Sequence, residues 1–408
     1  MSAYEELGVS AKKEAVHAAT KNNNKGLFPH AFCKINAFSH DISPFYVKIS
    51  HADGAGTKSA LAYMYWKETG DMSVWHGVVQ DSIVMNLDDL ACCGGVSVSS
   101  HLSLTSCINR NSLRIPDKVV AALIEGENIF LEKMDRLGIH ITGQCGETAD
   151  VSDLTRTVIV DNAMDCLMRE CDVIDNGNID EGDIIVGLAS NGQATYEDSY
   201  NSGMRSNGLT LARHGVLSKE YRAKYPETFE AELGDKAYRG SKKLTDTITV
   251  ETGEKIPVGK LILSPTRTYA PIVKELLTVG REGHRISGIV HNSGGGMTKV
   301  LHYLSKPLVV VKDDFFPVPP LFEMIQSETN VSWKEMYEVF NMGCGMEIYT
   351  REVPEADRII TTAKSFGVDA KVIGMVEKSP HTEKSGKRKS MVYIAAVNDA
   401  RGNFSYSR

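Results

Sequence analysis

A glycine-rich segment, DGAGTK at residues 53–58, combines groups that attract phosphate with one that repels it. The backbone N–H groups of such a loop and a lysine ammonium both attract phosphate oxygens. Asp53 has the same sign of charge as phosphate, but Mg²⁺ is commonly held by one or two carboxylates together with phosphate oxygens. We therefore expect Asp53 to bind a metal ion. The loop positions expected to face phosphate are Gly54, Gly56, Thr57 and Lys58.

More acids follow at residues 81–95, a segment predicted to be a helix. At 100° per residue its apolar side chains gather on one side and its acids on the other. The acidic side contains Asp81, Asp88 and Asp89, which could supply further metal ligands. An acidic helix face can also simply be solvated.

Glu147, in the sequence CGET, is a further candidate acid. Both Glu147 and Asp53 could instead cap a turn, which is a common role for an acid beside glycine. The glycines at 294–296 could likewise form a flexible linker. Because these signals all fall where strands give way to loops and helices, their joint occurrence favours a catalytic site.

Two familiar nucleotide-binding signatures are absent. No GxxxxGK[ST] occurs, since the Gly-Lys pairs at 259 and 386 are followed by Leu and Arg. A dinucleotide fingerprint is approached at Gly54 and Gly56, but Ser59 replaces its third glycine. A nucleotide site in this chain would therefore be of another type.

Strand and helix patterns alternate along the chain, which predicts an α/β (α+β) fold of two domains. The turn-rich residues 172–183 suggest the boundary, with domains at 1–172 and 173–408. The charged segment 219–244 is predicted to be a solvated insertion, and the basic segment 377–390 an exposed hairpin loop. Segments predicted to contain strands are 45–53, 139–150, 157–170, 184–192, 285–304, 307–313 and 339–350. Segments predicted to contain helices are 57–70, 81–95, 116–138, 206–215 and 285–304.

The composition is that of a globular protein with no bulk attraction for polyanions. The 408 residues are 42% hydrophobic, and the formal net charge is −7. We expect no nucleic-acid partner. No apolar run is long enough for a bilayer and the N-terminus lacks a secretory h-region, so we expect a cytoplasmic protein without membrane contact. The eight cysteines have no zinc-site spacing, which favours reduced and mostly buried thiols.

Seven segments in the same order resemble the phosphoribosylformylglycinamidine cyclo-ligase (aminoimidazole ribonucleotide synthetase) family. The family patterns are DGVGTK, a GID…ND helix, GGETAEM, HSNG, TPT-[RK]-x-Y, HITGGG and NMGVGM. The matching segments here are 53–58, 81–95, 146–150, 206–211, 264–269, 291–296 and 341–346.

This resemblance implies two α/β domains, with the N-terminal-domain sheets pairing across a homodimer. It also implies ATP and Mg²⁺ as cofactors and formylglycinamidine ribonucleotide as the substrate. The products would be 5-aminoimidazole ribonucleotide, ADP and phosphate. Phosphoryl transfer needs mainly positioning and charge neutralisation, so no nucleophilic triad is required.

The resemblance also assigns roles to individual residues. Asp53 and Asp89 match metal-associated acids, and Asp81, Glu147 and Asp89 match acids of the catalytic cleft. The phosphate loop is again Gly54, Gly56, Thr57 and Lys58. The expected substrate contacts, including those to the ribose phosphate, are Arg205, Ser206, Asn207, Gly208, Gly294, Gly295 and Gly296.

The chain departs from the family pattern at several positions. Arg205 stands where the family has His, after extra residues at 193–204, and Cys145 replaces the first glycine of GGET. An arginine there could bind phosphate. The N-terminal lysine contact could fall to Lys21 or Lys25. Two alternatives stay open: another ATP-using member of the superfamily, such as a small-molecule kinase or maturation factor, or a catalytically silent nucleotide-binding homologue.

Overall fold

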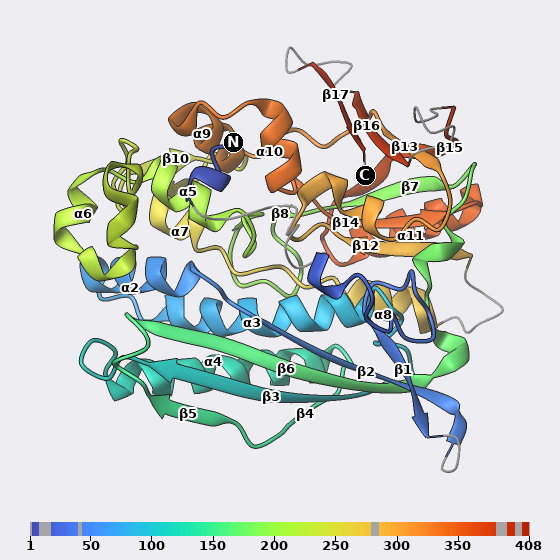
Figure 1. Cartoon of the computed structure of the whole chain (residues 1–408), viewed down its shortest axis with the longest axis horizontal. Helices are drawn as coiled ribbons and strands as arrows, with labels where there is room; N and C mark the ends of the chain where they lie inside the picture. Colours follow the sequence, from blue (N-terminus) through green and yellow to red (C-terminus); the bar gives the residue numbers. More distant parts are fainter. Residues whose placement is uncertain are drawn as a thin grey trace.

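Two β-sheets with their covering helices form the α/β architecture that the alternating patterns predict (Figure 1). The computed structural model describes residues 2–7, 18–39, 43–278, 285–380, 390–395 and 402–407. Strands of the first sheet come from residues 35–169 and those of the second from residues 184–407.

The first sheet has the order β1-β2-β6-β3-β4, and β5 also pairs with β3. β4 and β5 run parallel to β3, whereas the other pairs are antiparallel. Side chains of β6 alternate between buried and more exposed, so one face packs on helices and the other is uncovered. The strands are β1 (Ile35–Ser39), β2 (Ser43–Gly54), β3 (His101–Arg110), β4 (Ile141–Gly143), β5 (Glu147–Asp150) and β6 (Val158–Arg169).

The long helices of this half, within the described residues, are α2 (Lys58–Thr69), α3 (Ser73–Ala91) and α4 (Asp117–Arg136). α3 begins at Ser73, so the prediction of a helix start at Asp81 was wrong. The actual start signal is Asp71, whose carboxylate accepts hydrogen bonds from the N–H and the hydroxyl of Ser73 at 2.9 and 2.6 Å. α3 packs on β2 and β6 and lies between the two sheets (Figure 1).

The second sheet has the order β12-β14-β7-β15-β13-β16-β17. Residues 377–390 do not form a hairpin loop as predicted, because β15 and β16 lie on opposite sides of β13 and do not pair with each other. Much of that connection lies outside the described residues. The strands are β7 (Ile184–Ala189), β12 (Ile286–His291), β13 (Leu308–Lys312), β14 (Cys344–Thr350), β15 (Ala370–Lys378), β16 (Met391–Ala395) and β17 (Asn403–Ser407).

Short elements complete this half. The helices are η2 (Glu170–Asp172), η3 (Asn176–Asn178), α5 (Leu209–Val216), α6 (Glu220–Lys224), η4 (Pro226–Thr228), η5 (Ala231–Lys236), α7 (Val258–Ile262), α8 (Ala270–Thr278), η6 (Gly296–His302), α9 (Pro320–Thr329), α10 (Trp333–Val339) and α11 (Val353–Ser365). Two small ribbons pair β8 (Asn191–Gly192) with β9 (Asn201–Ser202) and β10 (Thr247–Thr249) with β11 (Lys255–Pro257).

The segment 219–244 is not the solvated insertion that its charge predicts. Tyr221 and Tyr238 are buried in it. Tyr225 packs edge-on against Tyr63 of α2 at 6.2 Å between ring centroids. The charged side chains point outward while the tyrosine rings cover α2, because aromatic rings bury large apolar areas.

Buried apolar side chains from both halves form one continuous core. The boundary after residue 172 falls between β6 and β7 and stays a prediction. All eight cysteines lie in the described ranges as free thiols, and five are buried, as expected. In the described part of the chain, no helix has the length and hydrophobicity needed to cross a membrane.

Candidate functional site

The DGAGTK loop joins β2 to α2 and keeps Asp53 at the surface. β2 ends at Gly54, and a Cβ there would lie 1.8 Å from the carboxylate of Asp161, so only glycine fits. Asp53 is exposed and accepts a hydrogen bond from the Gly54 N–H at 2.7 Å. The first helical turn of α2 follows without a side-chain cap. The loop therefore offers an exposed carboxylate, while the N–H groups of Gly54, Ala55 and Lys58 donate to other atoms of the protein.

The DGAGTK loop, the segment 206–210 and the triple glycine form a chain of contacts. The hydroxyls of Thr57 and Thr210 are 3.3 Å apart, which joins the loop to the start of α5. The Asn207 side-chain oxygen lies 3.1 Å from where a Gly294 Cβ would stand, which joins α5 to the triple glycine. Segments far apart in sequence, 53–58, 206–210 and 294–296, are thus neighbours.

Two glycines in these segments are required by close packing. Gly208 precedes α5 with a φ of 75°, and a Cβ there would lie 2.2 Å from the Phe340 ring. Gly296 has a φ of 49°, and its Cβ would lie 2.5 Å from the Phe340 carbonyl oxygen. Both conformations favour glycine. Phe340, just before NMGCGM, therefore supports both segments predicted to contact substrate.

Lys58 of α2 and Asp81 of α3 form a buried ion pair that also contacts the second half. The Lys58 ammonium donates to Asp81 Oδ1 at 2.8 Å and to the Ser264 carbonyl at 2.5 Å. Asp81 also accepts from the Thr266 N–H at 2.7 Å and its hydroxyl at 2.6 Å. Since neither side chain reaches solvent, their phosphate and catalytic roles stay predictions that need this pair to open.

Asp88 likewise binds the second half. It accepts from the Thr268 hydroxyl at 2.5 Å and from the Tyr269 N–H at 3.1 Å. Burial raises the pKa of Asp88 to about 7, although the nearby Arg205 guanidinium opposes the shift. Together with Asp81, it fixes SPTRTY to α3. The alternative of a solvated acidic face is thus wrong, because the second half covers these acids.

Asp89 lies between two histidines. Asp89 Oδ1 is 2.6 Å from Nδ1 of the buried His291, and Oδ2 is 3.4 Å from Nε2 of His51. Burial acts against the charged carboxylate, but the hydrogen bond and charge interaction with His291 outweigh it, so the pKa of Asp89 is lowered. Burial lowers the pKa of His291 to about 4. Both carboxylate oxygens of Asp89 therefore already have partners.

Glu147 points to the other side of the first sheet. In the strand register, Glu147 pairs with Cys107, Cys107 with Asp161, and Asp161 with Gly54. Directly paired residues share a face. This row is on the uncovered face, whereas Asp53 is on the helix-facing side with His51. Within one chain, the side chains of Glu147 and Asp53 therefore lie on opposite faces of the first sheet.

A Mg²⁺ site built from protein ligands alone is not preformed. Within the described ranges, no three His, Cys, Asp or Glu side chains are grouped closely enough to hold a metal ion. Asp53 fits a site completed by phosphate oxygens and water, since Mg²⁺ often keeps several waters. Asp89 fits less well, because His51 and His291 occupy its oxygens.

Arg205 is buried instead of lining an open surface. It is 2% exposed and has a positive φ of 63°. Its guanidinium lies over the Tyr269 ring at 5.4 Å from the centroid and donates to the Gly345 carbonyl at 2.9 Å. Among the described residues, its Nε has no hydrogen-bond partner, and its Nη2 has only an ion pair with Asp88 Oδ2 at 3.8 Å. A direct substrate contact by Arg205 stays a prediction.

Sequence reasoning missed three residues near these segments. Asp161 lies next to Gly54, Thr210 contacts Thr57, and the Lys299 stem is 3.8 Å from the Cβ position of Gly295. Asp161 could have been found from the strict alternation of β6. Lys299 could have been found as a cation one turn after a triple glycine.

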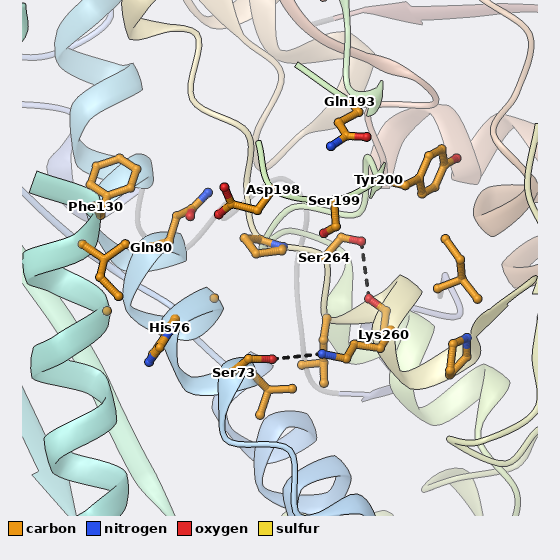
Figure 2. Close-up of a pocket in the computed structure, with 18 of the residues that line it drawn as sticks. Ser73, His76, Gln80, Phe130, Gln193, Asp198, Ser199, Tyr200, Lys260 and Ser264 are labelled. Carbon is orange, nitrogen blue, oxygen red and sulfur yellow. Dashed lines mark hydrogen bonds between the residues drawn. The ribbon is translucent and has the colours of Figure 1, made fainter. Parts of the chain in front are cut away.

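A cavity of about 690 Å³ lies elsewhere, among α3, α4 and the loops 193–200 and 254–265 (Figure 2). None of the predicted site residues lines it. Two lysines of its lining form ion pairs: Lys260 contacts Asp71 at 2.5 Å, and Lys133 contacts Asp198 at 2.9 Å. Lys260 also donates to the Ser73 hydroxyl at 3.1 Å, as Figure 2 shows. We therefore place the candidate site at the three converging segments.

Comparison with known proteins agrees with this architecture. The family described as AIR synthase related protein, C-terminal domain, matches residues 180–386. Phosphoribosylformylglycinamidine cyclo-ligase of Methanococcus maripaludis strain C6 is 26% identical over 360 residues, covering 87% of this chain and 84% of that protein. The enzyme of the same name from Brevibacillus brevis is 27% identical over 390 residues, covering 92% and 95%.

Solved structures share the fold at much lower identity. Phosphoribosylformylglycinamidine synthase II of Thermotoga maritima superposes with a TM-score of 0.53 at 11% identity, over 98% of this chain. The present chain spans 50% of that synthase chain. A chain of a HypE–HypF complex superposes with a TM-score of 0.51 at 12% identity, over 98% of this chain and 99% of that one. Because the family match covers half of its length, the chain belongs to the AIR synthase related protein family.

Proposed function

We propose that this protein is an ATP-dependent cyclo-ligase that converts formylglycinamidine ribonucleotide into 5-aminoimidazole ribonucleotide, ADP and phosphate. The observation that carries the proposal is the chain of contacts from DGAGTK to the segment 206–210 and from that segment to 294–296. Relatives of that name match over nearly the full length of the chain, which supports the same activity.

In this proposal the ATP phosphates lie at the loop formed by Gly54, Gly56, Thr57 and Lys58, with Asp53 as a ligand of Mg²⁺. The ion would neutralise phosphate charge. Backbone N–H groups of the loop would orient the γ-phosphate toward the formamide oxygen of the substrate. Ser206 to Gly208 and Gly294 to Gly296 would hold the ribonucleotide and its phosphate.

The chemistry would proceed in two steps. The formamide oxygen takes the γ-phosphoryl group from ATP, and ADP leaves. The amidine nitrogen then attacks the activated carbon, the ring closes with loss of a proton, and phosphate leaves. The second step is intramolecular, so correct orientation supplies much of the acceleration. In this scheme Glu147 belongs to the uncovered face that a homodimer would enclose.

The direct test is an assay with ATP, Mg²⁺ and formylglycinamidine ribonucleotide that follows aminoimidazole ribonucleotide and ADP together. The proposal expects the two products in equal amounts. ADP formation on a different phosphate acceptor, without imidazole product, would instead favour a small-molecule kinase of the same superfamily.

Asp53→Ala tests the metal role. We expect turnover to fall by about 100-fold or more, as when a group that stabilises transition-state charge is removed. The free energy of unfolding should change by no more than about 0.5 kcal/mol, because the Asp53 side chain is exposed. The matched control is Asp357→Ala, an exposed acid on α11. Near-normal turnover of Asp53→Ala would contradict the metal role.

A further inference from the structure

The N-terminal residues form a short preorganised turn, η1 (Glu5–Leu7), preceded by Ser2. The Ser2 N–H donates to Glu5 Oε2 at 2.8 Å, and the Glu5 N–H donates to the Ser2 hydroxyl at 3.2 Å. This reciprocal pair is a capping box. Leu7 is 6% exposed and anchors the turn in the core. The position of the intervening residue, Tyr4, is therefore fixed from both sides.

Tyr4 bridges two elements of the second half. Its backbone N–H donates to Glu335 Oε1 on α10 at 3.1 Å, and its phenol oxygen accepts from the backbone N–H of Gly208. Burial raises the pKa of Tyr4, and the Gly208 hydrogen bond opposes this shift. The phenol thus keeps its proton in neutral solution and can donate it to another group while it accepts from Gly208.

The segment that Tyr4 contacts has buried donors without acceptors. Within the described residues, the Asn207 side-chain Nδ2 and the Nε of the nearby, almost fully buried Arg205 have no hydrogen-bond partner, whereas Arg205 Nη2 lies 3.8 Å from Asp88 Oδ2. Buried polar groups are normally paired. Unpaired donors on neighbouring residues indicate that an acceptor with negative charge belongs beside this segment.

We propose that Tyr4 is a substrate-binding residue whose phenol donates a hydrogen bond to the phosphate of a phosphorylated ribose held at Ser206–Gly208. The inference rests on the proposed function for the location of the ribonucleotide. It extends that function by assigning the N-terminal turn to phosphate recognition.

Calorimetric titration of the full-length protein with ribose 5-phosphate tests this assignment without requiring turnover. We expect Tyr4→Phe to bind ribose 5-phosphate about tenfold more weakly or worse, since a hydrogen bond to a charged group is lost. Ribose without phosphate should show no difference between the two proteins. Tyr393→Phe, which removes a phenol from exposed β16, is the matched control and should bind like the wild type.

Steady-state kinetics separate a binding role from a structural one. Tyr4→Phe should raise KM for formylglycinamidine ribonucleotide about tenfold, leaving kcat and the KM for ATP unchanged. Equal or tighter binding of ribose 5-phosphate by Tyr4→Phe, or no binding by the wild type, overturns the assignment. The two proposals can fail separately. If Tyr4→Phe binds ribose 5-phosphate more weakly but the wild type forms no aminoimidazole ribonucleotide, the phosphate contact of Tyr4 is supported and the cyclo-ligase activity is refuted.

Discussion

At the scale of single residues, burial separates acids that look alike in sequence. Asp81 and Asp88 are completely buried, whereas Asp53 and Glu147 are exposed. A buried carboxylate needs partners, because leaving it unpaired is costly. The buried acids therefore bind the second half of the chain, whereas the exposed acids are in contact with solvent.

Asp88 should make stability depend on pH. Its usual pKa of 3.8 applies to the unfolded chain, whereas its pKa in the folded protein is about 7. Between these values the native state holds a proton that the unfolded state has lost. The contribution of Asp88 to the free energy of unfolding is therefore complete below its unfolded-state pKa, and it is lost as the pH rises through the folded-state pKa.

Asp88→Asn removes this titration. Relative to the wild type, the free energy of unfolding of the variant should increase between about pH 5 and about pH 8, by up to about 3 kcal/mol at about 1.4 kcal/mol per pKa unit. Urea unfolding at each pH measures it. His291 and His214, whose pKa values are lowered, act with the opposite sign in both proteins, so the difference isolates Asp88. If the free energy of unfolding changes with pH in the same way in the wild type and in Asp88→Asn, this prediction is wrong.

At the scale of elements, α3 is the helix that both sheets share. One side packs on β2 and β6 of the first sheet. The other side presents Asp81, Asp88 and Asp89 to SPTRTY and His291. The position of the second half over the DGAGTK loop thus depends on hydrogen bonds to one helix.

Asp81→Asn should weaken this connection. Removing one partner of a buried ion pair leaves Lys58 uncompensated, and such changes cost about 3–5 kcal/mol. We expect a loss of this size in the free energy of unfolding, measured in urea. Asp357→Asn on the exposed face of α11 is the control.

The double variant Lys58→Met/Asp81→Asn gives the second arm of this test. It should be more stable than the sum of the single changes predicts, because it leaves no unpaired charge. Simple additivity would show that the two charges do not stabilise each other.

At the scale of the whole molecule, one face of the first sheet is uncovered. Across its middle, Ala52, Ala163 and Thr105 pair in one row, and all three are exposed. Small side chains there leave the face flat enough for close approach of a second sheet. This is the surface through which the predicted homodimer would form.

Ala163→Arg tests that surface. A long charged side chain in the central row should prevent two sheets from packing face to face. Sedimentation equilibrium is expected to give a dimer for the wild type and a monomer for the variant, with unchanged circular dichroism. A wild-type monomer, or a variant that still dimerises, would count against this interface.

The sequence alone predicted much of the fold. The alternating residues at 45–53, the apolar run at 184–192 and the glycine that closes α2 depend only on neighbouring residues, so the local sequence predicts them. The start of α3 was missed because Asp81 looks like a helix-starting acid, whereas Asp71 makes the actual contact with Ser73. The tyrosines of 219–244 were missed because their burial depends on α2.

The sequence by itself determined which residues could bind phosphate and a metal ion, since glycines, acids and a lysine have that chemistry in any fold. Only the tertiary structure decided which of them are available. Packing of the second half on α3 buries Lys58 and Asp81 and pairs Asp89 with His291. The same packing brings Tyr4 to Gly208, a contact across about half the chain that local patterns do not encode.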